Sequence, residues 1–298
     1  MRRRLFVLAA CFGLVASIVS AQTTLDDKFF DSKGVKIRYV DVGRGEPVVL
    51  VHGFSSSLDA NWAGTHVIEA LAKDFRVVAL DCRGHGKSDK PHDAKSYGME
   101  MIEDVARLMD HLGVAKAHIV GYSMGGAITG KFIVTHPDRV ISAVFGGSAP
   151  RVAWTAQNEK DSEELAASLE QGHGMRPLIL RLSPPNEPKP SDEVIEAQSR
   201  ASLGRNDAIA LAFVQRSNKA QVTTETQVRA LTTPMLAVVG GADPLKAAVE
   251  AFKASVPSLN VVVIDGATHS GARGAPARPE FRDAVHDFLM AHRAATSQ

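Results

Sequence analysis

The chain has 298 residues, of which 45% are hydrophobic, 22% are charged and 24 are glycine. These values describe one globular domain with a full hydrophobic core, and they exclude a largely disordered chain. The formal net charge is +1, and loss of Arg2, Arg3 and Arg4 with a leader would leave 31 basic against 33 acidic residues, a net charge of −2. This balance gives no reason to expect nucleic acid or an anionic membrane as a partner.

The first 21 residues have the layout of an export signal. Three arginines precede an apolar run from Leu5 to Val19, and Val19-Ser20-Ala21 supplies the small residues that signal peptidase reads. We therefore expect a signal peptide at 1–21 and a mature protein at 22–298, periplasmic or extracellular and without stable membrane association after cleavage. An uncleaved membrane anchor is the alternative, since an apolar stretch of this length could just cross a bilayer. Both general and twin-arginine export fit the arginines.

Cys82 is the only cysteine of the expected mature chain, because Cys11 lies within the signal. No intramolecular disulfide can therefore form, even in an oxidising compartment. A lone cysteine beside the end of a strand is interpreted as a small packing residue and not as a nucleophile.

From residue 35 onward, apolar runs alternate with amphipathic stretches of roughly ten to fifteen residues. Strands are predicted over residues 35–40, 47–51, 75–80, 117–120, 140–145, 235–239 and 260–264. Helices are predicted over residues 61–72, 99–112, 127–135, 245–254 and 279–292. The first strand alternates like an edge strand, whereas the continuous apolar runs are typical of strands covered on both faces. The alternation predicts an α/β fold with a mainly parallel β-sheet flanked by helices.

The alternation breaks between about residues 150 and 233, which we interpret as an inserted helical cap. Helices are predicted there over residues 158–171, 191–203, 206–216 and 224–231, with a proline-rich segment at 184–190. Two apolar groups of the cap either roof a pocket or pack on the body. The groups are Leu178, Ile179, Leu180 and Leu182, and Ile209, Leu211, Phe213 and Val214.

The segment that ends in Gly86-Lys87-Ser88 resembles the end of a phosphate-binding loop. Such a loop needs a glycine at position 81, where the sequence has Asp81. A nucleotide site is therefore not predicted. The histidines show no paired ligand spacing, so we do not expect a metal site.

The stretch from Gly121 to Gly126 lies between a predicted strand and a predicted helix. Gly121 and Gly125, two residues before and after Ser123, allow a tight turn that exposes the serine in a strained conformation. The following helix directs its dipole and free N–H groups at negative charge developing near the serine. This order of strand, turn and helix indicates that Ser123 is a nucleophile.

Two further candidates follow later strands. In open parallel sheets, functional groups gather beyond the carboxyl ends of the strands, where Ser123, Asp243 and His269 all fall. We expect His269 to take the proton of Ser123 and deliver it to the leaving alcohol, while Asp243 orients the imidazole. The backbone N–H groups of Phe54 and Met124 are the expected oxyanion donors.

Five motifs carry a resemblance to a known family. They are His52-Gly53-Phe54, Asp81-x-Arg83-Gly84-His85-Gly86-x-Ser88, Gly121-x-Ser123-x-Gly125-Gly126, Gly241-x-Asp243-Pro244 and Gly266-x-x-His269. With them the chain resembles α/β-hydrolase fold enzymes from about residue 30 onward. It is most similar to the capped branch that holds carboxylesterases, lactonases such as 3-oxoadipate enol-lactonase, and carbon–carbon bond hydrolases. Dehalogenases and epoxide hydrolases of that branch carry an aspartate nucleophile, and Ser123 argues against both.

The resemblance also assigns the residues around the three candidates. His52, Gly53, Gly121 and Gly125 support the motifs, and His52 and His85 are interpreted as stabilising turns. Some relatives place the acid after the sixth strand, but residues 146–150 contain no carboxylate, and Asp265 leaves the wrong strand. Trp62 and Tyr122 either edge the pocket or pack in the core.

The resemblance and the expected export signal together imply an exported serine hydrolase that cleaves a small carboxylic ester, thioester or lactone through an acyl-enzyme, with no metal or organic cofactor. One alternative is carbon–carbon bond hydrolysis, although that family usually carries a glycine- and proline-containing oxyanion loop where this chain has Ser55-Ser56-Ser57. The other alternative is a non-catalytic binding protein on the same fold. The cap follows no motif, so the sequence names no substrate.

Overall fold

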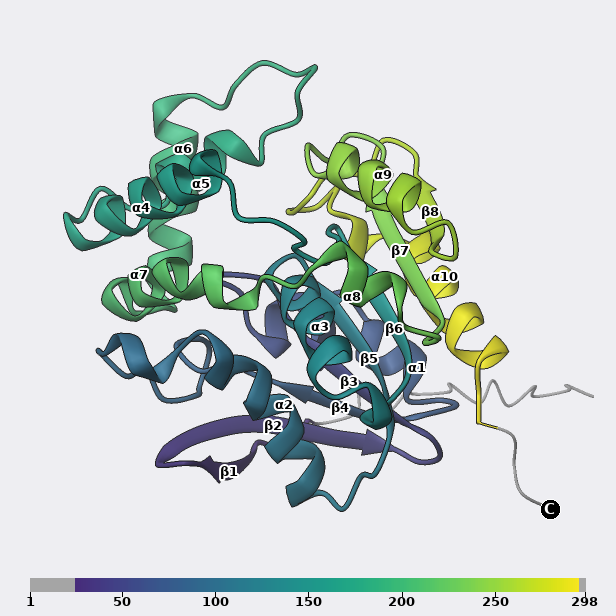
Figure 1. The fold of residues 1–298 in the computed structure, drawn as a ribbon. Coiled ribbons are helices and arrows are strands. Elements are labelled where there is room, and N and C mark those ends of the chain that lie inside the picture. The colour runs from purple at the N-terminus through teal and green to yellow at the C-terminus, as the bar shows by residue number, and fades with distance from the viewer. Residues whose placement is uncertain (1–24, 295–298) are drawn as a thin grey trace, which may run out of the picture.

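The computed structural model describes residues 25–294, and within them the chain forms an eight-stranded sheet (Figure 1). The strands are β1 (Lys28–Ser32), β2 (Val35–Gly43), β3 (Pro47–Val51), β4 (Arg76–Leu80), β5 (Ala117–Tyr122), β6 (Val140–Gly146), β7 (Met235–Gly240) and β8 (Asn260–Ile264). Their order is β1-β2-β4-β3-β5-β6-β7-β8. The pairs β1–β2 and β2–β4 are antiparallel, and all later pairs are parallel. The predicted α/β fold with a mainly parallel sheet is confirmed. The expected signal peptide lies outside the described residues.

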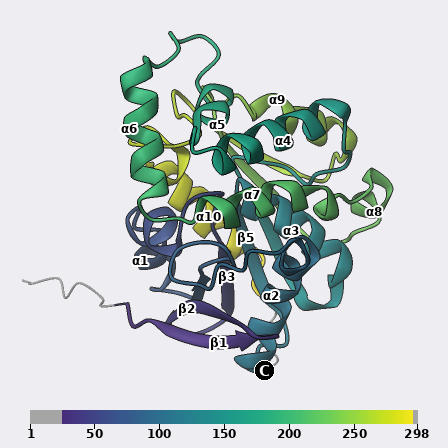
Figure 2. The ribbon, with the colours of Figure 1, turned by 90° about the vertical axis from the view of Figure 1, so that its left-hand side faces the viewer.

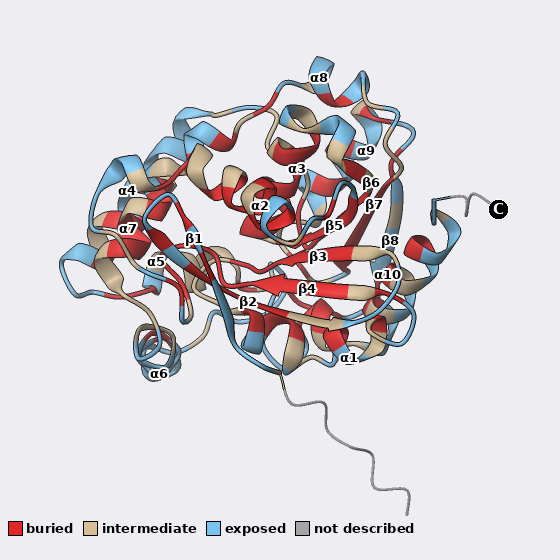
Figure 3. Ribbon diagram, turned by 90° about the horizontal axis from the view of Figure 1, so that it is seen from below, coloured by how far each residue is buried: buried red, intermediate tan, exposed pale blue. Residues whose placement is uncertain are grey.

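Helices cover both faces of the sheet. On one face lie α1 (Val67–Leu71) and α10 (Pro279–Ala291), and on the other lie α2 (Met99–His111), α3 (Met124–Thr135) and α9 (Lys246–Ser255). Successive side chains of a strand point to opposite faces, so β3 sends Val49 and Val51 into the α2 and α3 layer, and Val48 and Leu50 into the other. Figure 3 shows that buried residues concentrate along the central strands. This double burial explains why the strands read as continuous apolar runs.

The remaining α-helices follow β6 and precede β7. They are α4 (Ala156–Glu170), α5 (Arg176–Arg181), α6 (Asp192–Leu203), α7 (Ala208–Ser217) and α8 (Glu225–Arg229). We refer to α4 to α7 as the cap helices; they lie together at one end of the molecule (Figures 1 and 2). Their own small core contains Leu165, Leu169, Met175 and Leu211. Four of the five helices begin at a side chain that accepts a hydrogen bond from the first turn, namely Thr155, Ser191, Asp207 and Thr224.

Two local predictions were wrong. The strand over 35–40 is β2, and it is not an edge strand because β1, which the sequence analysis missed, pairs with it. The single helix expected over 61–72 is divided into a π-helical turn (Asp59–Ala63) and α1. His66 separates them with a φ of 61°, a left-handed conformation that a continuous helix does not contain.

A buried pair of opposite charges joins the loop after β4 to α2. The Arg83 guanidinium, on the loop after β4, donates two hydrogen bonds of 2.7 and 2.6 Å to the Asp104 carboxylate of α2. Both side chains are almost completely buried, with exposed fractions of 2% and 1%. A bidentate arginine–carboxylate pair satisfies both charges, whereas either one alone would be very costly to bury.

We therefore expect the Asp104→Asn substitution to lower the free energy of unfolding by about 3–5 kcal/mol, because Arg83 keeps its buried charge without a carboxylate. Asp110→Asn on the same helix is the matched control. Asp110 pairs with Arg139 and is 64% exposed, so its loss should cost less than about 1 kcal/mol. Urea unfolding followed by circular dichroism measures both values. Equal losses in the two variants would contradict this role of the Arg83–Asp104 pair.

Candidate active site

Ser123 lies on a sharp turn between β5 and α3. Its backbone has a φ of 53° and a ψ of −111°, which is rare for a residue with a side chain and strained by about 1–3 kcal/mol. Two glycines make the turn possible. A Cβ on Gly121 would lie 2.1 Å from the carbonyl oxygen of Gly125, and a Cβ on Gly125 would lie 2.0 Å from that of Val51. The turn thus holds the half-buried Ser123 side chain clear of its own strand and helix.

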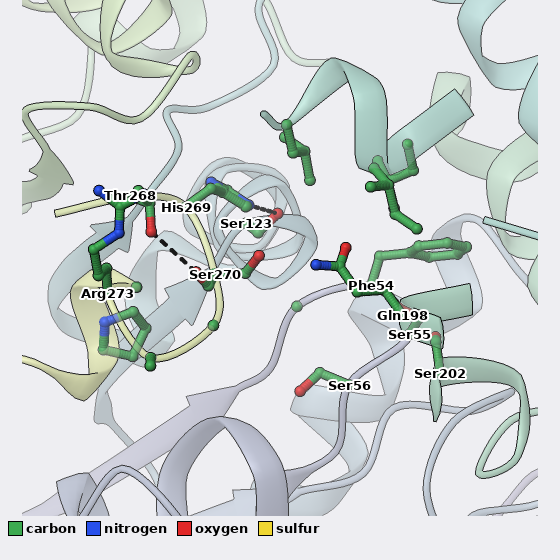
Figure 4. Close-up of a pocket in the computed structure, with 18 of the residues that line it drawn as sticks. Phe54, Ser55, Ser56, Ser123, Gln198, Ser202, Thr268, His269, Ser270 and Arg273 are labelled. Carbon is green, nitrogen blue, oxygen red and sulfur yellow. Dashed lines mark hydrogen bonds between the residues drawn. The ribbon is translucent and has the colours of Figure 1, made fainter. Parts of the chain in front are cut away.

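The structure brings the three predicted residues together. His269 Nε2 lies 2.9 Å from Ser123 Oγ (Figure 4), and His269 Nδ1 lies 2.8 Å from Asp243 Oδ2. The second oxygen of Asp243 accepts a hydrogen bond of 2.8 Å from the backbone N–H of Leu245. Because a carboxylate only accepts hydrogen bonds, Nδ1 carries the proton and Nε2 is left to accept the Ser123 hydroxyl proton.

The sheet order explains this convergence. Ser123 follows β5, Asp243 follows β7 and His269 follows β8, and these parallel strands end at the same edge of the sheet. Asp243 and His269 are each only 3% exposed. Asp265, the rejected candidate, is exposed, and Asp243 occupies the Nδ1 side of the imidazole instead.

Tyr122 holds the third loop in place. Its hydroxyl donates a hydrogen bond of 2.6 Å to the backbone carbonyl of His269, and burial raises the pKa of the phenol well above its usual value. The ring packs perpendicular to that of Trp62, which is fully buried in the α1 and α10 layer. Tyr122 therefore serves both the core and the site. No motif reveals this contact, since Tyr122 occupies a variable position of G-x-S-x-G.

The two expected oxyanion donors are also free. Within residues 25–294, neither the Phe54 N–H nor the Met124 N–H has a hydrogen-bond acceptor. The loop that carries Phe54 is fixed from two sides: Asn61 accepts a hydrogen bond of 2.9 Å from the Gly53 N–H, and the Asn206 amide donates one of 2.9 Å to the Ser55 carbonyl. Both N–H groups are thus available to a ligand oxygen.

His52 and His85, the two histidines that the resemblance assigns to the stabilisation of turns, make structural contacts. His52 donates through Nδ1 to the Gly53 carbonyl at 2.7 Å and accepts the Cys82 N–H at Nε2, 3.0 Å away. His85 donates through Nδ1 to the carbonyl of Arg83. Burial lowers the pKa of both rings, that of His85 to about 3, so both are neutral at neutral pH. Burial likewise raises the pKa of the Cys82 thiol, which leaves it unreactive.

Two cavities meet at Ser123. We call the first, of about 830 Å³, the histidine-side cavity, because the loop from Thr268 to Ala277 lines it together with α6 and Ser55 and Ser56 (Figure 4). The second, of about 730 Å³, is the helix-side cavity, lined by Met124, residues 148–155, α4 and α9. Both cavities share Phe54, Ser123, Leu178 and Leu182.

Of the two apolar groups of the cap, the structure places the first along the cavities and the second mainly in packing contacts. Leu178, Ile179 and Leu182 of the α5 segment line the cavities. In the second predicted group, Leu211 belongs to the cap core, Val214 packs into the core of the body and Phe213 stacks on Tyr97.

Across residues 25–294, no cluster of three His, Cys, Asp or Glu side chains is placed to hold a metal ion, and no helix is long and apolar enough to cross a bilayer.

The sheet order and the turn at Ser123 agree with the comparison of this chain with known protein families. The family model described as the alpha/beta hydrolase fold matches residues 46–272, so the chain belongs to the alpha/beta hydrolase fold family. The resemblance on which the sequence analysis relied is confirmed.

Curated relatives match the chain over part of its length. Over 119 residues it is 42% identical to the dihydrolipoyllysine-residue acetyltransferase component of the acetoin cleaving system of Cupriavidus necator, covering 40% of this chain and 31% of that protein. Over 122 residues it is 34% identical to a putative 2-succinyl-6-hydroxy-2,4-cyclohexadiene-1-carboxylate synthase of Bacillus subtilis, covering 40% and 43%. Over 117 residues it is 35% identical to 2-hydroxymuconate semialdehyde hydrolase of a Pseudomonas strain, covering 39% and 41%. These matches span less than half of each relative.

Solved structures match almost the whole chain. A thermophilic esterase from Thermogutta terrifontis is 25% identical with a TM-score of 0.73, covering 90% of this chain and 100% of that one. A carboxylesterase structure from Nitrososphaera gargenis is 22% identical with a TM-score of 0.72, covering 89% and 98%. The second likeness shows the fold alone.

The turn at Ser123 yields a stability prediction. Gly125→Ala would press a methyl group against the Val51 carbonyl, so we expect the free energy of unfolding to fall by about 3 kcal/mol or more. Gly204→Ala is the control, because Gly204 ends α6 with a φ of −62° that alanine adopts readily, and its effect should stay below about 1 kcal/mol. Denaturant unfolding measures both. An unperturbed Gly125→Ala protein would show that the turn is looser than described.

Proposed function

We propose that this protein is a serine hydrolase that cleaves a small carboxylic ester, thioester or lactone through an acyl-enzyme. The observation that carries the proposal is the continuous hydrogen-bonded series from Asp243 through His269 to Ser123 at the junction of two cavities. A serine beside a base that is itself oriented by a carboxylate is the arrangement that activates a hydroxyl for attack.

In the proposed reaction, Ser123 Oγ attacks the substrate carbonyl carbon while His269 Nε2 takes its proton. The N–H groups of Phe54 and Met124 bind the oxygen on which negative charge develops. The imidazolium, stabilised by Asp243, then delivers the proton to the leaving alcohol as the carbon–oxygen bond breaks. Water repeats the sequence on the acyl-enzyme: His269 takes its proton, the acid is released, and Ser123 recovers its proton.

A second candidate is hydrolysis of a carbon–carbon bond. It is supported by the partial match to a protein named 2-hydroxymuconate semialdehyde hydrolase, while the Ser55-Ser56-Ser57 loop departs from that family. Both candidates use the same serine. A vinylogous diketone acid offered alongside ethyl and nitrophenyl esters separates them, because a carbon–carbon bond hydrolase should turn over the diketone much faster.

The serine mechanism is tested by Ser123→Ala. We expect kcat on nitrophenyl acyl esters to fall by about 10³-fold or more, with loss of labelling by a fluorophosphonate probe, because the residue that forms the covalent bond is absent. Ser258→Ala, at an exposed position between α9 and β8, is the control and should retain wild-type values. Unchanged turnover in Ser123→Ala would refute the mechanism, and labelling of Ser123 without turnover of any ester would favour the carbon–carbon bond hydrolase or a binding role.

We also propose that the protein is exported with removal of residues 1–21. The arginines, the apolar run and the small residues up to Ala21 support this proposal. The intact mass of protein purified from the culture medium or the periplasm of the producing cell should correspond to a chain that begins at Gln22. A mature chain that begins at Met1 would overturn the proposal.

A further inference from the structure

The helix-side cavity contains positive charge that the proposed reaction does not use. Arg151, on the segment after β6, and Arg181, the last residue of α5, both line it. Asp161 of α4 is the only carboxylate among the described residues that line this cavity. It faces Arg181, with 3.4 Å between Arg181 Nη1 and the carboxylate, and it accepts a further hydrogen bond of 2.6 Å from the Gln157 amide. One arginine charge is therefore left over.

That remaining charge belongs to Arg151. Within residues 25–294, no carboxylate lies within 4.0 Å of its guanidinium, and its Nη1 donates a hydrogen bond of 2.8 Å to the Asn218 carbonyl. The guanidinium lies 5.3 Å from the centre of the Trp154 ring, and the Arg151 carbonyl accepts a hydrogen bond of 2.9 Å from the Thr223 N–H. These contacts hold the half-buried side chain in place. In the part of the chain that the structure describes, most of its five N–H donors have no partner.

Arg151 remains charged at neutral pH. Burial, with the nearby Arg181 as a smaller cause, lowers the pKa of its guanidinium to about 10. A cation withdrawn from water without an opposite charge is costly for the folded protein, and a bound anion would offset that cost. Arginine is suited to a carboxylate, because its planar fork matches the two oxygens.

The position of His269 indicates which part of a substrate would meet Arg151. The leaving alcohol must take its proton from His269, which lines the histidine-side cavity and not the helix-side cavity. The acyl part, which stays bonded to Ser123, then extends on the other side of the serine. There it passes Met124, whose N–H is one oxyanion donor, toward the segment that carries Arg151.

We propose that the helix-side cavity is an acyl-binding site that recognises a free carboxylate through Arg151, so that the preferred substrates are half-esters of dicarboxylic acids. This inference rests on the proposed ester hydrolysis for its assignment of the acyl side. In the reaction the ester carbon–oxygen bond of the half-ester breaks, its carbonyl carbon bonds to Ser123 Oγ, and the alcohol leaves with a proton from His269. Water then releases the dicarboxylate.

The kinetic test compares matched alkyl esters. Monoethyl succinate, glutarate and adipate are assayed against ethyl butanoate, pentanoate and hexanoate by proton release at constant pH. We expect kcat/KM for at least one half-ester to exceed that of its neutral counterpart by about 10-fold or more, the gain typical of a hydrogen bond to a charged group. Arg151→Met should lower kcat/KM for that half-ester by about 10- to 100-fold and change the neutral ester by less than about threefold.

Two controls identify the charge. Arg151→Lys keeps the charge and loses the fork, so it should restore part of the preference, and Arg200→Met, on the exposed face of α6, should keep all of it. Equal turnover of half-esters and neutral esters by the wild-type protein would overturn the proposal, as would an equal loss on both in Arg151→Met. If Arg151→Met does not fold, judged by circular dichroism, the wild-type preference and the Arg151→Lys variant decide the outcome.

A binding measurement separates this proposal from the proposed function. Isothermal titration of the wild-type protein with adipate should give binding that Arg151→Met weakens by at least about 10-fold, and hexanoate should bind less tightly than adipate. Binding of this kind without turnover of any ester would remove the proposed function and retain the anion site. Ester turnover without Arg151-dependent adipate binding would retain the hydrolase and remove the anion site.

Discussion

The hydrogen bond between the Asp243 carboxylate and His269 Nδ1 is the interaction on which the site depends. At 2.8 Å, between groups that are each 3% exposed, it fixes which imidazole nitrogen carries the proton and which one faces Ser123. The Leu245 N–H holds the other carboxylate oxygen, so the charge of Asp243 is hydrogen-bonded on both sides. Tyr122, which precedes Ser123, binds the backbone of His269 and thereby joins the loops after β5 and β8. The geometry of the three side chains is thus set by the sheet and not by the cap.

The cap determines what can reach that geometry. Phe54 packs both against the core of the body and against the small core of the cap helices, so the loop that carries one expected oxyanion donor is in contact with both layers. Leu178 and Leu182 line both cavities, as Ser123 does. One cavity contains His269, the proposed proton donor for a leaving group. The other contains Arg151, for which residues 25–294 provide no carboxylate partner. A hydrolase with this arrangement would bind the leaving group of its substrate in one cavity and the acyl part in the other.

Sequence reasoning worked where local pattern and physical constraint coincide. Strands buried on both faces must be apolar throughout, and the turn at Ser123 needs glycine at positions 121 and 125 because any Cβ there would meet a carbonyl oxygen. Both patterns are visible in a short stretch of sequence, without knowledge of which distant residues pack against it. The sequence pattern does not predict β1, because this edge strand buries only alternate residues, such as Phe30 and Ser32, and is polar overall.

The contacts that sequence reasoning could not supply connect residues far apart in the chain. The Tyr122 hydroxyl reaches a carbonyl 147 residues away, and Arg151 meets Asn218 across the cap. Whether an arginine has a carboxylate partner depends on every segment that packs around it. The sequence also left open whether the two apolar groups of the cap line a pocket or pack on the body. That depends on how the cap helices are arranged in space, which the sequence pattern does not show.

The most direct test of the account is the identity of the covalent intermediate. The protein is mixed with a slowly released acyl ester, quenched in acid during turnover, digested and examined by mass spectrometry. We expect one acyl group per chain, on the peptide that contains Ser123, and no acyl group on the Ser123→Ala protein. Steady ester turnover with no acyl group on Ser123, or with the acyl group on another residue, would contradict it.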